Sequence, residues 1–351
     1  MKILLVSNMY PSNDDPIFGS FVENIEDGLR TNGADVDKIV IKGRGQNIVD
    51  KLKKYFKFYM KILFADLSKY DVVQISYPTH TFLPFLFKTI NNTKIISRFH
   101  GDDLLHERNL NKILKYFTNK AIEKSSLIIV PSNYFANEFR IRHGENKEIY
   151  IYPSGGVDRK KFYPIKLQKD SFNLGYVGRI TKQKGVGVLL DAVKDLNIDF
   201  KLYIIGDGPD MAYYKKYVYN LNLIDKIIFV GMIKNNELVH YYNLFDLFIF
   251  PTMRKAESFG NVAIEAMACK VPIIGSKIAG LNDYIFDNQN GYFFNIGDSN
   301  DLRKKIEQYF ILDEDSKDKM KLEAYNIAMK YEKNKLNRKF IQKLQQLKGE
   351  N

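Results

Sequence analysis

Residues 172–185 read FNLGYVGRITKQKG: an apolar strand pattern runs to Gly178 and passes into a loop that carries two cations, Arg179 and Lys184. Apolar runs of this kind recur along the chain and alternate with longer stretches of helical periodicity. Such alternation is typical of parallel β-sheets flanked by helices. Ligands in that architecture bind beyond the carboxyl ends of the strands. The loops that follow strands are therefore where we expect the chemistry of this chain.

The predicted strands form two series, separated by a polar stretch at 164–171. The first series comprises Ile3–Val6, Val36–Ile41, Val72–Ile75, Lys94–Arg98, Leu127–Val130 and Ile149–Tyr152. The second series comprises Phe172–Val177, Lys201–Ile205, Ile227–Val230, Leu247–Phe250 and Pro272–Gly275. The restart predicts two Rossmann-like α/β domains, at 1–165 and 166–330, joined by a linker at 164–171. The charged helical pattern at the end of the chain predicts a C-terminal helix, 331–351, that packs back on the first domain.

The composition suits a protein with two packed cores, since 45% of the 351 residues are hydrophobic. The single cysteine, Cys269, excludes a disulfide framework and fits a reducing compartment. No run approaches the roughly 20 apolar residues of a membrane span, and the first residues are expected to form a strand rather than a signal peptide. We therefore expect the protein in the cytoplasm, either free or peripheral at the inner face of the cell membrane.

The net charge of +12 favours a phosphate-rich partner. Residues 1–170 carry 27 Lys and Arg against 19 Asp and Glu, a net +8, and the remainder carries 26 against 22, a net +4. No RNA- or DNA-binding motif accompanies this charge, so we expect no nucleic acid partner. We also expect no essential metal, because the histidines show no paired metal-ligand spacing. They are His80, His100, His106, His143 and His240.

Two carboxylates flank a small, turn-prone stretch in the second half, where 257–265 reads ESFGNVAIE. We place Glu257 on a loop before a helix and Glu265 about two turns further on, with Asn261 on the same helical face. Free backbone N–H groups at such a helix start favour an anion. Two nearby carboxylates can bind sugar or ribose hydroxyls, so this segment is a candidate site for a nucleotide sugar.

Five segments of the second half occur in a characteristic order. They are Gly178-Arg179…Lys184-Gly185, Gly206-Asp207-Gly208, Val230-Gly231, Phe250-Pro251 and Glu257…Glu265. Together they resemble the glycosyltransferases of the GT-B fold, specifically the large retaining family often called family 4, the glycosyl transferases group 1 type. The resemblance extends to the first half through Tyr10-Pro11…Phe18-Gly19-Ser20-Phe21-Val22, His100-Gly101-Asp102, Pro131-Ser132 and Tyr152-Pro153-Ser154-Gly155-Gly156-Val157-Asp158…Phe162. Ser154 departs from the family, in which asparagine is common at this place.

The resemblance implies an α/β GT-B fold: two Rossmann-like domains whose parallel sheets face one another across a cleft. The first domain is the acceptor side and the second is the nucleotide-sugar donor side. By this resemblance His100, Arg179, Lys184 and Glu257 are the catalytic residues, and His100 and Asp102 lie on the acceptor side. The implied donor-binding residues are Gly19, Arg179, Lys184, Gly206, Gly208, Val230, Glu257, Ser258, Phe259, Gly260, Asn261 and Glu265.

Within this implied donor site, Arg179 and Lys184 neutralise the diphosphate, and Glu265 holds the ribose hydroxyls. Glu257, with the backbone of Phe259 and Gly260, holds the transferred sugar. Gly19 lets the N-terminal loop close over the phosphates. Closure of the two domains, with a hinge near 164–171 and the C-terminal helix, is expected to exclude water from a bond that water could hydrolyse.

The implied activity is that of a retaining glycosyltransferase of the hexosyltransferase type. The donor is a nucleotide-diphospho-sugar, either a UDP-hexose or UDP-N-acetylhexosamine or else a GDP-sugar, which acts as co-substrate without any tightly bound cofactor. The acceptor is a glycan or a lipid-linked sugar of a bacterial surface polysaccharide, such as a capsule, exopolysaccharide or O-antigen. Two alternatives stay open: a sugar-nucleotide epimerase with the same fold, and a non-catalytic nucleotide-binding scaffold.

A separate feature is the basic, aromatic-rich segment 51–63, KLKKYFKFYMKIL. On a helix its apolar side chains form one face and three of its lysines, Lys51, Lys54 and Lys61, lie opposite. The apolar set is Leu52, Tyr55, Phe56, Tyr59, Ile62 and Leu63. Such a helix is either a reversible membrane-surface contact or an ordinary domain helix with solvated lysines.

Overall fold

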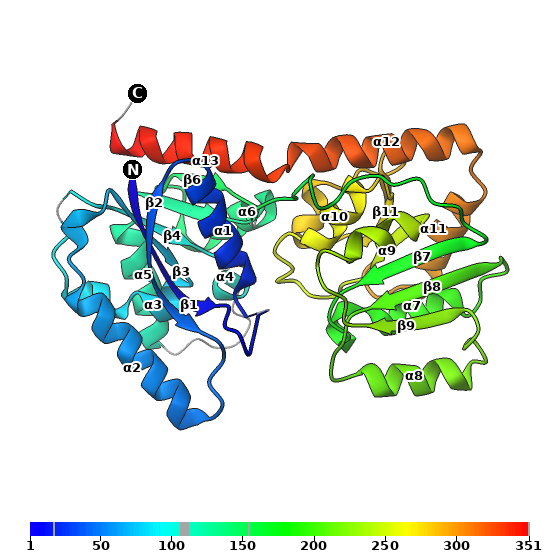
Figure 1. Cartoon of the computed structure of the whole chain (residues 1–351), viewed down its shortest axis with the longest axis horizontal. Helices are drawn as coiled ribbons and strands as arrows, with labels where there is room; N and C mark the ends of the chain where they lie inside the picture. Colours follow the sequence, from blue (N-terminus) through cyan, green and yellow to red (C-terminus); the bar gives the residue numbers. More distant parts are fainter. Residues whose placement is uncertain (17, 91, 106–111, 154, 350–351) are drawn as a thin grey trace. The chain divides into compact units, whose positions relative to one another are not determined.

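The structure is a computed structural model that describes residues 1–16, 18–90, 92–105, 112–153 and 155–349. The chain forms two compact units, Met1–Gly155 with Lys333–Asn351 and Gly156–Glu332 (Figure 1). Each unit contains a six-stranded sheet in which every pair of neighbouring strands is parallel. The prediction of two Rossmann-like α/β domains is confirmed, and the facing of their sheets across a cleft stays a prediction. None of the helices in the described ranges is long and apolar enough to cross a membrane.

The sheet of the first unit has the strand order β2-β1-β3-β4-β5-β6. Its strands are β1 (Lys2–Tyr10), β2 (Asp35–Lys42), β3 (Val72–Ser76), β4 (Lys94–Arg98), β5 (Leu127–Val130) and β6 (Ile149–Ile151). Its helices are α1 (Ser20–Thr31), α2 (Ile48–Phe64), α3 (Pro78–Thr81), α4 (Asp102–Leu105), α5 (Lys112–Lys124), α6 (Asn133–His143) and α13 (Lys333–Lys348), with 3₁₀ turns η1 (Leu67–Lys69) and η2 (Leu83–Phe87).

Both faces of this sheet are covered, which is why its strands read as continuous apolar runs. On one face Leu29 of α1 and Phe340 of α13 pack against Ile3 of β1. On the other face Phe58 of α2 and Phe85 of η2 lie in a second cluster. The last helix of the chain thus belongs to the core of the first unit.

The sheet of the second unit has the strand order β12-β11-β10-β7-β8-β9. Its strands are β7 (Phe172–Val177), β8 (Phe200–Ile205), β9 (Ile227–Gly231), β10 (Leu247–Phe250), β11 (Ile273–Ser276) and β12 (Gly291–Phe294). Its helices are α7 (Val186–Val193), α8 (Met211–Asn220), α9 (Leu238–Leu244), α10 (Asn261–Ala268), α11 (Ser299–Phe310) and α12 (Glu314–Lys330), with 3₁₀ turns η3 (Lys182–Lys184) and η4 (Ala279–Asp283). Helices α9, α10 and α12 supply one apolar cluster, and α7, α8 and α11 supply the other.

The predicted strands are all present, most with bounds shifted by a residue or two. The sequence prediction did not include β12, a short strand that begins at Gly291 and pairs with β11. Cys269 is buried and free, in agreement with the absence of a disulfide framework.

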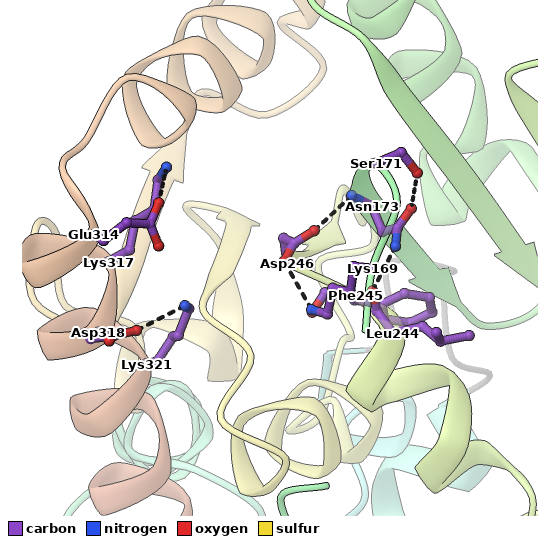
Figure 2. Close-up of polar contacts among 10 residues, drawn as sticks. All are labelled: Lys169, Ser171, Asn173, Leu244, Phe245, Asp246, Glu314, Lys317, Asp318 and Lys321. Carbon is purple, nitrogen blue, oxygen red and sulfur yellow. Dashed lines mark hydrogen bonds and ion pairs between the residues drawn. The ribbon is translucent and has the colours of Figure 1, made fainter. Parts of the chain in front are cut away.

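The stretch 164–171, predicted to be a linker, is attached to the second unit by polar contacts. The Nζ atom of Lys169 donates hydrogen bonds to Asp246 Oδ1 and to the carbonyl oxygen of Phe245, each at 2.8 Å (Figure 2). The backbone N–H of Asn173 donates to Asp246 Oδ2, and Ser171 Oγ donates to Asn173 Oδ1. These contacts hold the stretch against the start of β7 and the start of β10.

The residues just before this stretch also pack on the second unit. The backbone N–H of Val157 donates to the carbonyl oxygen of Tyr331, and the ring of Phe162 lies 5.7 Å from that of Tyr242. Asn243 Nδ2 donates to the carbonyl oxygen of Tyr163. The division therefore lies at 155/156 and 332/333, whereas the sequence placed it at 165/166 and 330/331. Side-chain packing that the local pattern does not reveal accounts for this difference.

Helix α2 corrects the prediction for segment 51–63. Phe58 and Ile62 are buried, and Tyr55 and Tyr59 pack partly buried against the same cluster. Leu52 and Phe56, which the sequence placed on the same face, are exposed. The prediction of one apolar face is wrong, because apolar residues occupy more of the helix circumference than the sheet covers.

Candidate functional site

The candidate site of the second unit lies where the strand order reverses. If the strands are numbered 1 to 6 along the chain from β7 to β12, their order across the sheet, read from β9, is 3-2-1-4-5-6. The direction of the order reverses between β7 and β10, which are adjacent. In sheets of this kind ligands bind at that reversal, beyond the carboxyl ends of the strands. The loops after β7 and β10 meet there: the backbone N–H of Met253 donates to the carbonyl oxygen of Gln183 at 2.9 Å. The loops touch so closely that a Cβ on Gly185 would lie 1.8 Å from the carbonyl oxygen of Pro251.

An ion pair joins the two loops. Lys184 Nζ donates to Glu257 Oε2 at 2.6 Å, and the two side chains are 20% and 9% exposed. Thr252 Oγ1, which is buried, donates to the same carboxylate oxygen at 3.1 Å. The ammonium group also lies 5.8 Å from the ring centroid of Phe250. Two residues that the sequence assigned to catalysis are therefore in direct contact.

Arg179 lies on the loop after β7, beside the glycine turn that follows β8. The backbone N–H of Ile180 donates to the carbonyl oxygen of Asp207 at 2.9 Å, and the buried hydroxyl of Tyr176 donates to the carbonyl oxygen of Arg179 at 3.0 Å. Gly206 has φ 128°, and a Cβ there would lie 2.0 Å from the carbonyl oxygen of Gly178. The Arg179 side chain is exposed and, within the described ranges, makes no ion pair.

The turn after β8 continues the same edge of the sheet. The backbone N–H of Gly206 donates to the carbonyl oxygen of Gly231, which follows Val230 at the end of β9. A Cβ on Gly208 would lie 2.1 Å from the carbonyl oxygen of Ile180. The predicted residues Gly206 and Gly208 thus lie in the turn after β8, against the loop that carries Arg179, and Val230 lies near the end of the next strand, β9.

Gly260 is the N-cap of helix α10 and adopts the left-handed conformation, with φ 75° and no side-chain capping hydrogen bond. A Cβ at Gly260 would lie 2.4 Å from Phe250 Cε1, so the close approach favours glycine. The side chain of Phe259 points into the core, with its ring 5.1 Å from Tyr284 and 4.9 Å from Tyr331. Only the backbone of Phe259 can therefore serve a ligand. Asn261 is the first residue of α10.

The loop before this helix is also closely packed. A Cβ on Gly280 would lie 2.3 Å from the carbonyl oxygen of Ser258, so the 3₁₀ turn η4 packs directly against the backbone of this loop. Ser258 itself is half-buried between Glu257 and the core residue Phe259.

Glu265 does not join the Lys184–Glu257 pair. Its Oε2 accepts a hydrogen bond from the buried hydroxyl of Tyr242 at 2.9 Å. Burial raises the pKa of this carboxyl group to about 7, although the Tyr242 hydrogen bond and the charge of Lys161 act in the opposite direction. The predicted contact of Glu265 with ribose hydroxyls stays a prediction.

His100, in the first unit, follows β4 and lies within an aromatic cluster. Its ring stacks on Tyr77 with centroids 4.5 Å apart and lies 4.7 Å from the ring of Phe21. Burial, with a smaller contribution from the Arg98 guanidinium, holds the pKa of His100 well below its usual range. The imidazole is therefore neutral at pH 7, and its Nε2 has no hydrogen-bond partner within the described ranges.

Asp103 holds the loop that carries His100. Its Oδ1 accepts hydrogen bonds from the backbone N–H groups of His100 at 2.8 Å and Gly101 at 3.1 Å. Burial raises the pKa of Asp103 to about 7. Its neighbour Asp102, which the sequence assigned to the acceptor side, is exposed at the start of α4.

Gly19 precedes α1 with φ 74°, and a Cβ there would lie 2.6 Å from both Met9 C and Tyr10 N. The glycine loop is thus held against the end of β1, and any other residue at this position would displace it. Gly19, His100 and Asp102 belong to the first unit, and the other predicted site residues belong to the second. Ser154 and His106 lie outside the described residues.

The sequence prediction missed three side chains that position the site: Thr252, Tyr176 and Tyr242. Thr252 follows β10 after one intervening residue, Pro251, and a hydroxyl residue close to a strand end was a usable signal. Tyr176 and Tyr242 come from the interior of β7 and from α9 and carried no such signal. Among the described residues, no group of three His, Cys, Asp or Glu could hold a metal ion. The absence of an essential metal stays a prediction.

Comparison with known proteins finds a family match in the second unit. Residues 158–327 match the family described as Glycosyl transferases group 1. The uncharacterized glycosyltransferase MJ1178 of Methanocaldococcus jannaschii is 34% identical over 212 residues, which are 60% of this chain and 57% of that protein. N-acetyl-alpha-D-glucosaminyl L-malate synthase of Bacillus anthracis is 26% identical over 253 residues, 67% of this chain and 64% of that protein. The capsular polysaccharide biosynthesis glycosyltransferase CapM of Staphylococcus aureus is 34% identical over 152 residues, 41% of this chain and 38% of that protein. The chain thus matches less than two thirds of the length of each of these relatives.

Solved structures match over the whole chain. Sucrose-phosphate synthase from Thermosynechococcus elongatus has a TM-score of 0.80 at 19% identity and covers 100% of both chains. HepE from Anabaena, solved in complex with UDP-glucose, has a TM-score of 0.75 at 18% identity and covers 99% of this chain and 100% of its own. These likenesses show the fold, which is that of the GT-B glycosyltransferases. The second unit of this GT-B chain carries a glycosyl transferases group 1 domain.

Proposed function

We propose that this chain is a retaining glycosyltransferase of family 4 that transfers a sugar from a nucleotide-diphospho-sugar to a glycan or lipid-linked acceptor. The Lys184–Glu257 pair, whose lysine lies on the loop after β7 that also carries Arg179, at the strand-order reversal of the second unit, is the observation that carries the proposal. Both cations follow β7, and the carboxylate precedes the uncapped start of α10. A diphosphate is bound by cations and N–H groups, which Arg179, Lys184 and the start of α10 supply. Sugar hydroxyls need hydrogen-bond acceptors, which the Glu257 carboxylate supplies.

The proposed chemistry depends on charge. When the bond between the sugar and the diphosphate breaks, negative charge develops on the leaving nucleoside diphosphate. Arg179 and Lys184 stabilise that charge, together with the backbone N–H groups at the start of α10. Lys184 can then divide its interaction between the diphosphate and Glu257, which keeps the carboxylate in place for sugar hydroxyls. Glu257, the carboxylate of this set, accepts hydrogen bonds from Lys184 and Thr252, so we propose attack on the face from which the leaving group departs rather than a covalent intermediate.

We propose that the donor is a UDP-hexose or UDP-N-acetylhexosamine, with a GDP-sugar as the alternative. HepE was solved with UDP-glucose, and that likeness supports a uridine donor here. CapM is named for capsular polysaccharide biosynthesis, which supports a surface polysaccharide as the product. Neutral His100 lies on the first unit, which we propose as the acceptor side. None of these observations favours the epimerase or the non-catalytic scaffold.

The test is a panel of nucleotide sugars, UDP-glucose, UDP-galactose, UDP-N-acetylglucosamine and GDP-mannose, measured by calorimetry and by slow donor hydrolysis. We expect binding of one or two of them and a loss of turnover of about 10²–10³ in Arg179→Ala, because one transition-state contact is removed. Lys182→Ala is the matched control, since it removes an exposed cation from the same turn. Absence of binding by the folded protein, or equal turnover of Arg179→Ala and the wild type, would overturn the assignment. NMR of the product reports whether the anomeric configuration is retained.

A further inference from the structure

A cavity of about 530 Å³ lies between helices α7 and α8 of the second unit. The two helices pack into the same apolar cluster, and the loops after β7, β8 and β10 complete the cavity wall. Met253, one of the lining residues, is joined to the loop that carries Lys184, because its backbone N–H donates to the carbonyl oxygen of Gln183 at 2.9 Å. Among the described residues that line the cavity, none is a predicted donor-site residue. It is a feature separate from the candidate site, and we call it the α7–α8 cavity.

Two tyrosines on α8 give one wall of the α7–α8 cavity an aromatic surface. Tyr213 and Tyr217 lie one turn apart, with ring centroids separated by 6.4 Å and ring planes at 4° to one another. Tyr213 is 67% exposed and Tyr217 is half-buried. Exposed aromatic side chains scattered singly are normal. Two parallel rings at a cavity wall are different, because they offer adjacent apolar faces to a ligand; we call them the aromatic platform.

Gly187 keeps the α7 side of the cavity open. It lines the cavity without a side chain, and a Cβ at this position would lie 3.3 Å from the hydroxyl oxygen of Tyr214. Tyr214 is buried, and its ring lies 5.2 Å from that of Tyr213 at an angle of 75°. The glycine thus leaves room for a ligand beside a tyrosine ring that is itself fixed by burial.

Two carboxylates line the cavity, and each is held on one oxygen. Asp191 Oδ1 accepts a hydrogen bond from the Tyr217 hydroxyl and lies 3.7 Å from Lys194 Nζ. Asp210 Oδ2 accepts from the backbone N–H of Lys182 at 2.7 Å. Within the described ranges, Asp191 Oδ2 and Asp210 Oδ1 accept no hydrogen bond. The cavity therefore offers two positioned acceptors beside the aromatic platform.

This combination fits a sugar ring better than a charged ligand. A pyranose has apolar C–H faces, which are attracted to the negative face of an aromatic ring, and hydroxyl groups at its edge that need acceptors. Two carboxylates disfavour a phosphate or another anion through like-charge repulsion. An ammonium ligand gains less, because Lys194 already lies against Asp191. We infer that the α7–α8 cavity binds a neutral saccharide, with one ring on the aromatic platform and its hydroxyl groups donating to Asp191 and Asp210.

Saccharide binding at this cavity goes beyond the proposed transfer reaction and does not depend on it. All the lining residues belong to the second unit, and none takes part in the proposed transfer chemistry. For the proposed glycosyltransferase, the cavity would hold a segment of a polysaccharide chain against the donor-side unit. That use rests on the proposed function, whereas the binding itself does not, so binding is measured without a donor.

The chain contains no tryptophan, so a single introduced indole reports on the cavity. Tyr213→Trp keeps an aromatic ring on the platform. Tyr219→Trp is the matched control, because Tyr219 lies on the same helix, is 68% exposed and does not line the cavity. With maltotriose, cellotriose, mannotriose and triacetylchitotriose we expect a saturable change in the emission of Tyr213→Trp for at least one sugar, and none for Tyr219→Trp. No response to any of the four, or equal responses of the two variants, would overturn the inference.

Saturation-transfer NMR tests the same contact in proteins without the indole, with the trisaccharide that responds. Tyr213→Ser should weaken its binding about tenfold, roughly the effect of removing one large ring from the contact, and Tyr219→Ser should leave it unchanged. Asp191→Ala should also weaken binding about tenfold, because one hydrogen bond to a charged acceptor is lost. Asp195→Ala is the control for that change, since it removes an exposed carboxylate just after α7.

Two results would refute the assignment of the cavity to a saccharide. Trisaccharide binding that is undiminished in both Tyr213→Ser and Asp191→Ala would place the sugar elsewhere on the protein. A response of Tyr213→Trp to uridine but to no trisaccharide would assign the cavity to a nucleoside. Nucleotide-sugar binding by Tyr213→Ser should equal that of the wild type, which keeps this test independent of the donor site.

Discussion

Lys184→Met should destabilise the second unit as well as impair transfer. The substitution removes the cation that lies 2.6 Å from Glu257 and leaves a carboxylate that is 9% exposed. Thr252 Oγ1, at 3.1 Å, is then the remaining donor to Oε2 in the described contacts. Removal of one partner from a buried pair costs about 3–5 kcal/mol. Because Lys184 itself is 20% exposed, we expect the lower end, about 3 kcal/mol.

Scanning calorimetry measures this change. For a unit of this size, about 3 kcal/mol corresponds to a fall in Tm of roughly 6–12 °C. The control is Lys321→Met, which breaks the surface pair with Asp318 at 2.9 Å (Figure 2). Asp318 is 72% exposed, so this loss should be below about 1 kcal/mol.

The double variant Lys184→Met with Glu257→Gln separates charge from packing. The glutamine at position 257 of the double variant carries no charge, so no buried charge is left without a partner. We therefore expect the decrease in Tm of the double variant, relative to the wild type, to be at most half of the decrease in Lys184→Met. A double variant as unstable as Lys184→Met, or a Lys184→Met protein within 2 °C (roughly the effect of 0.5–1 kcal/mol) of the wild type, would refute the reasoning.

Three further outcomes can be checked by thermal unfolding. Gly260→Ala should lower Tm more than Gly297→Ala: both sites have positive φ, but a Cβ at Gly260 lies 2.4 Å from Phe250, and one at Gly297 comes no closer than 3.8 Å to its neighbour, Met253 Sδ. Burial raises the pKa of Glu265 above its ordinary value of 4.5 to about 7, so the folded state holds a proton that the unfolded state releases. The free energy of unfolding should therefore fall as pH rises from 5 to 7, and the fall should be smaller in Glu265→Gln. An equal dependence of Tm on pH in the wild type and in Glu265→Gln would contradict this prediction. Asp103→Leu should cost about 1–3 kcal/mol because it removes the acceptor of two backbone N–H groups, whereas Asp103→Asn keeps an acceptor oxygen; equal losses would contradict this role.

The strands could be predicted from the sequence because both sheet faces are covered. Strands buried on two sides read as continuous apolar runs, and Leu127–Val130 and Leu247–Phe250 were predicted at the bounds that the structure shows. The same signal failed for β12, where Gly291 opens a four-residue strand after a polar turn. The order of the motif residues along the chain was also readable, and with it the family resemblance.

The contact between the two motif residues Lys184 and Glu257 was decided by tertiary structure. Lys184 and Glu257 are 73 residues apart and touch because β7 lies beside β10, a strand order that apolar periodicity does not specify. The same limit explains the unit boundary, since Phe162 belongs to the second unit through tertiary packing in its core, where its ring lies 5.7 Å from that of Tyr242.

Helix α2 shows the division most directly. The sequence determined that it is helical, basic and apolar over much of its circumference. Periodicity alone could not decide which apolar side chains find a partner, because that depends on where the sheet and η2 lie. The fold buries Phe58 and Ile62 and leaves Leu52 and Phe56 in solvent, because one side of a helix can contact a sheet while the other cannot.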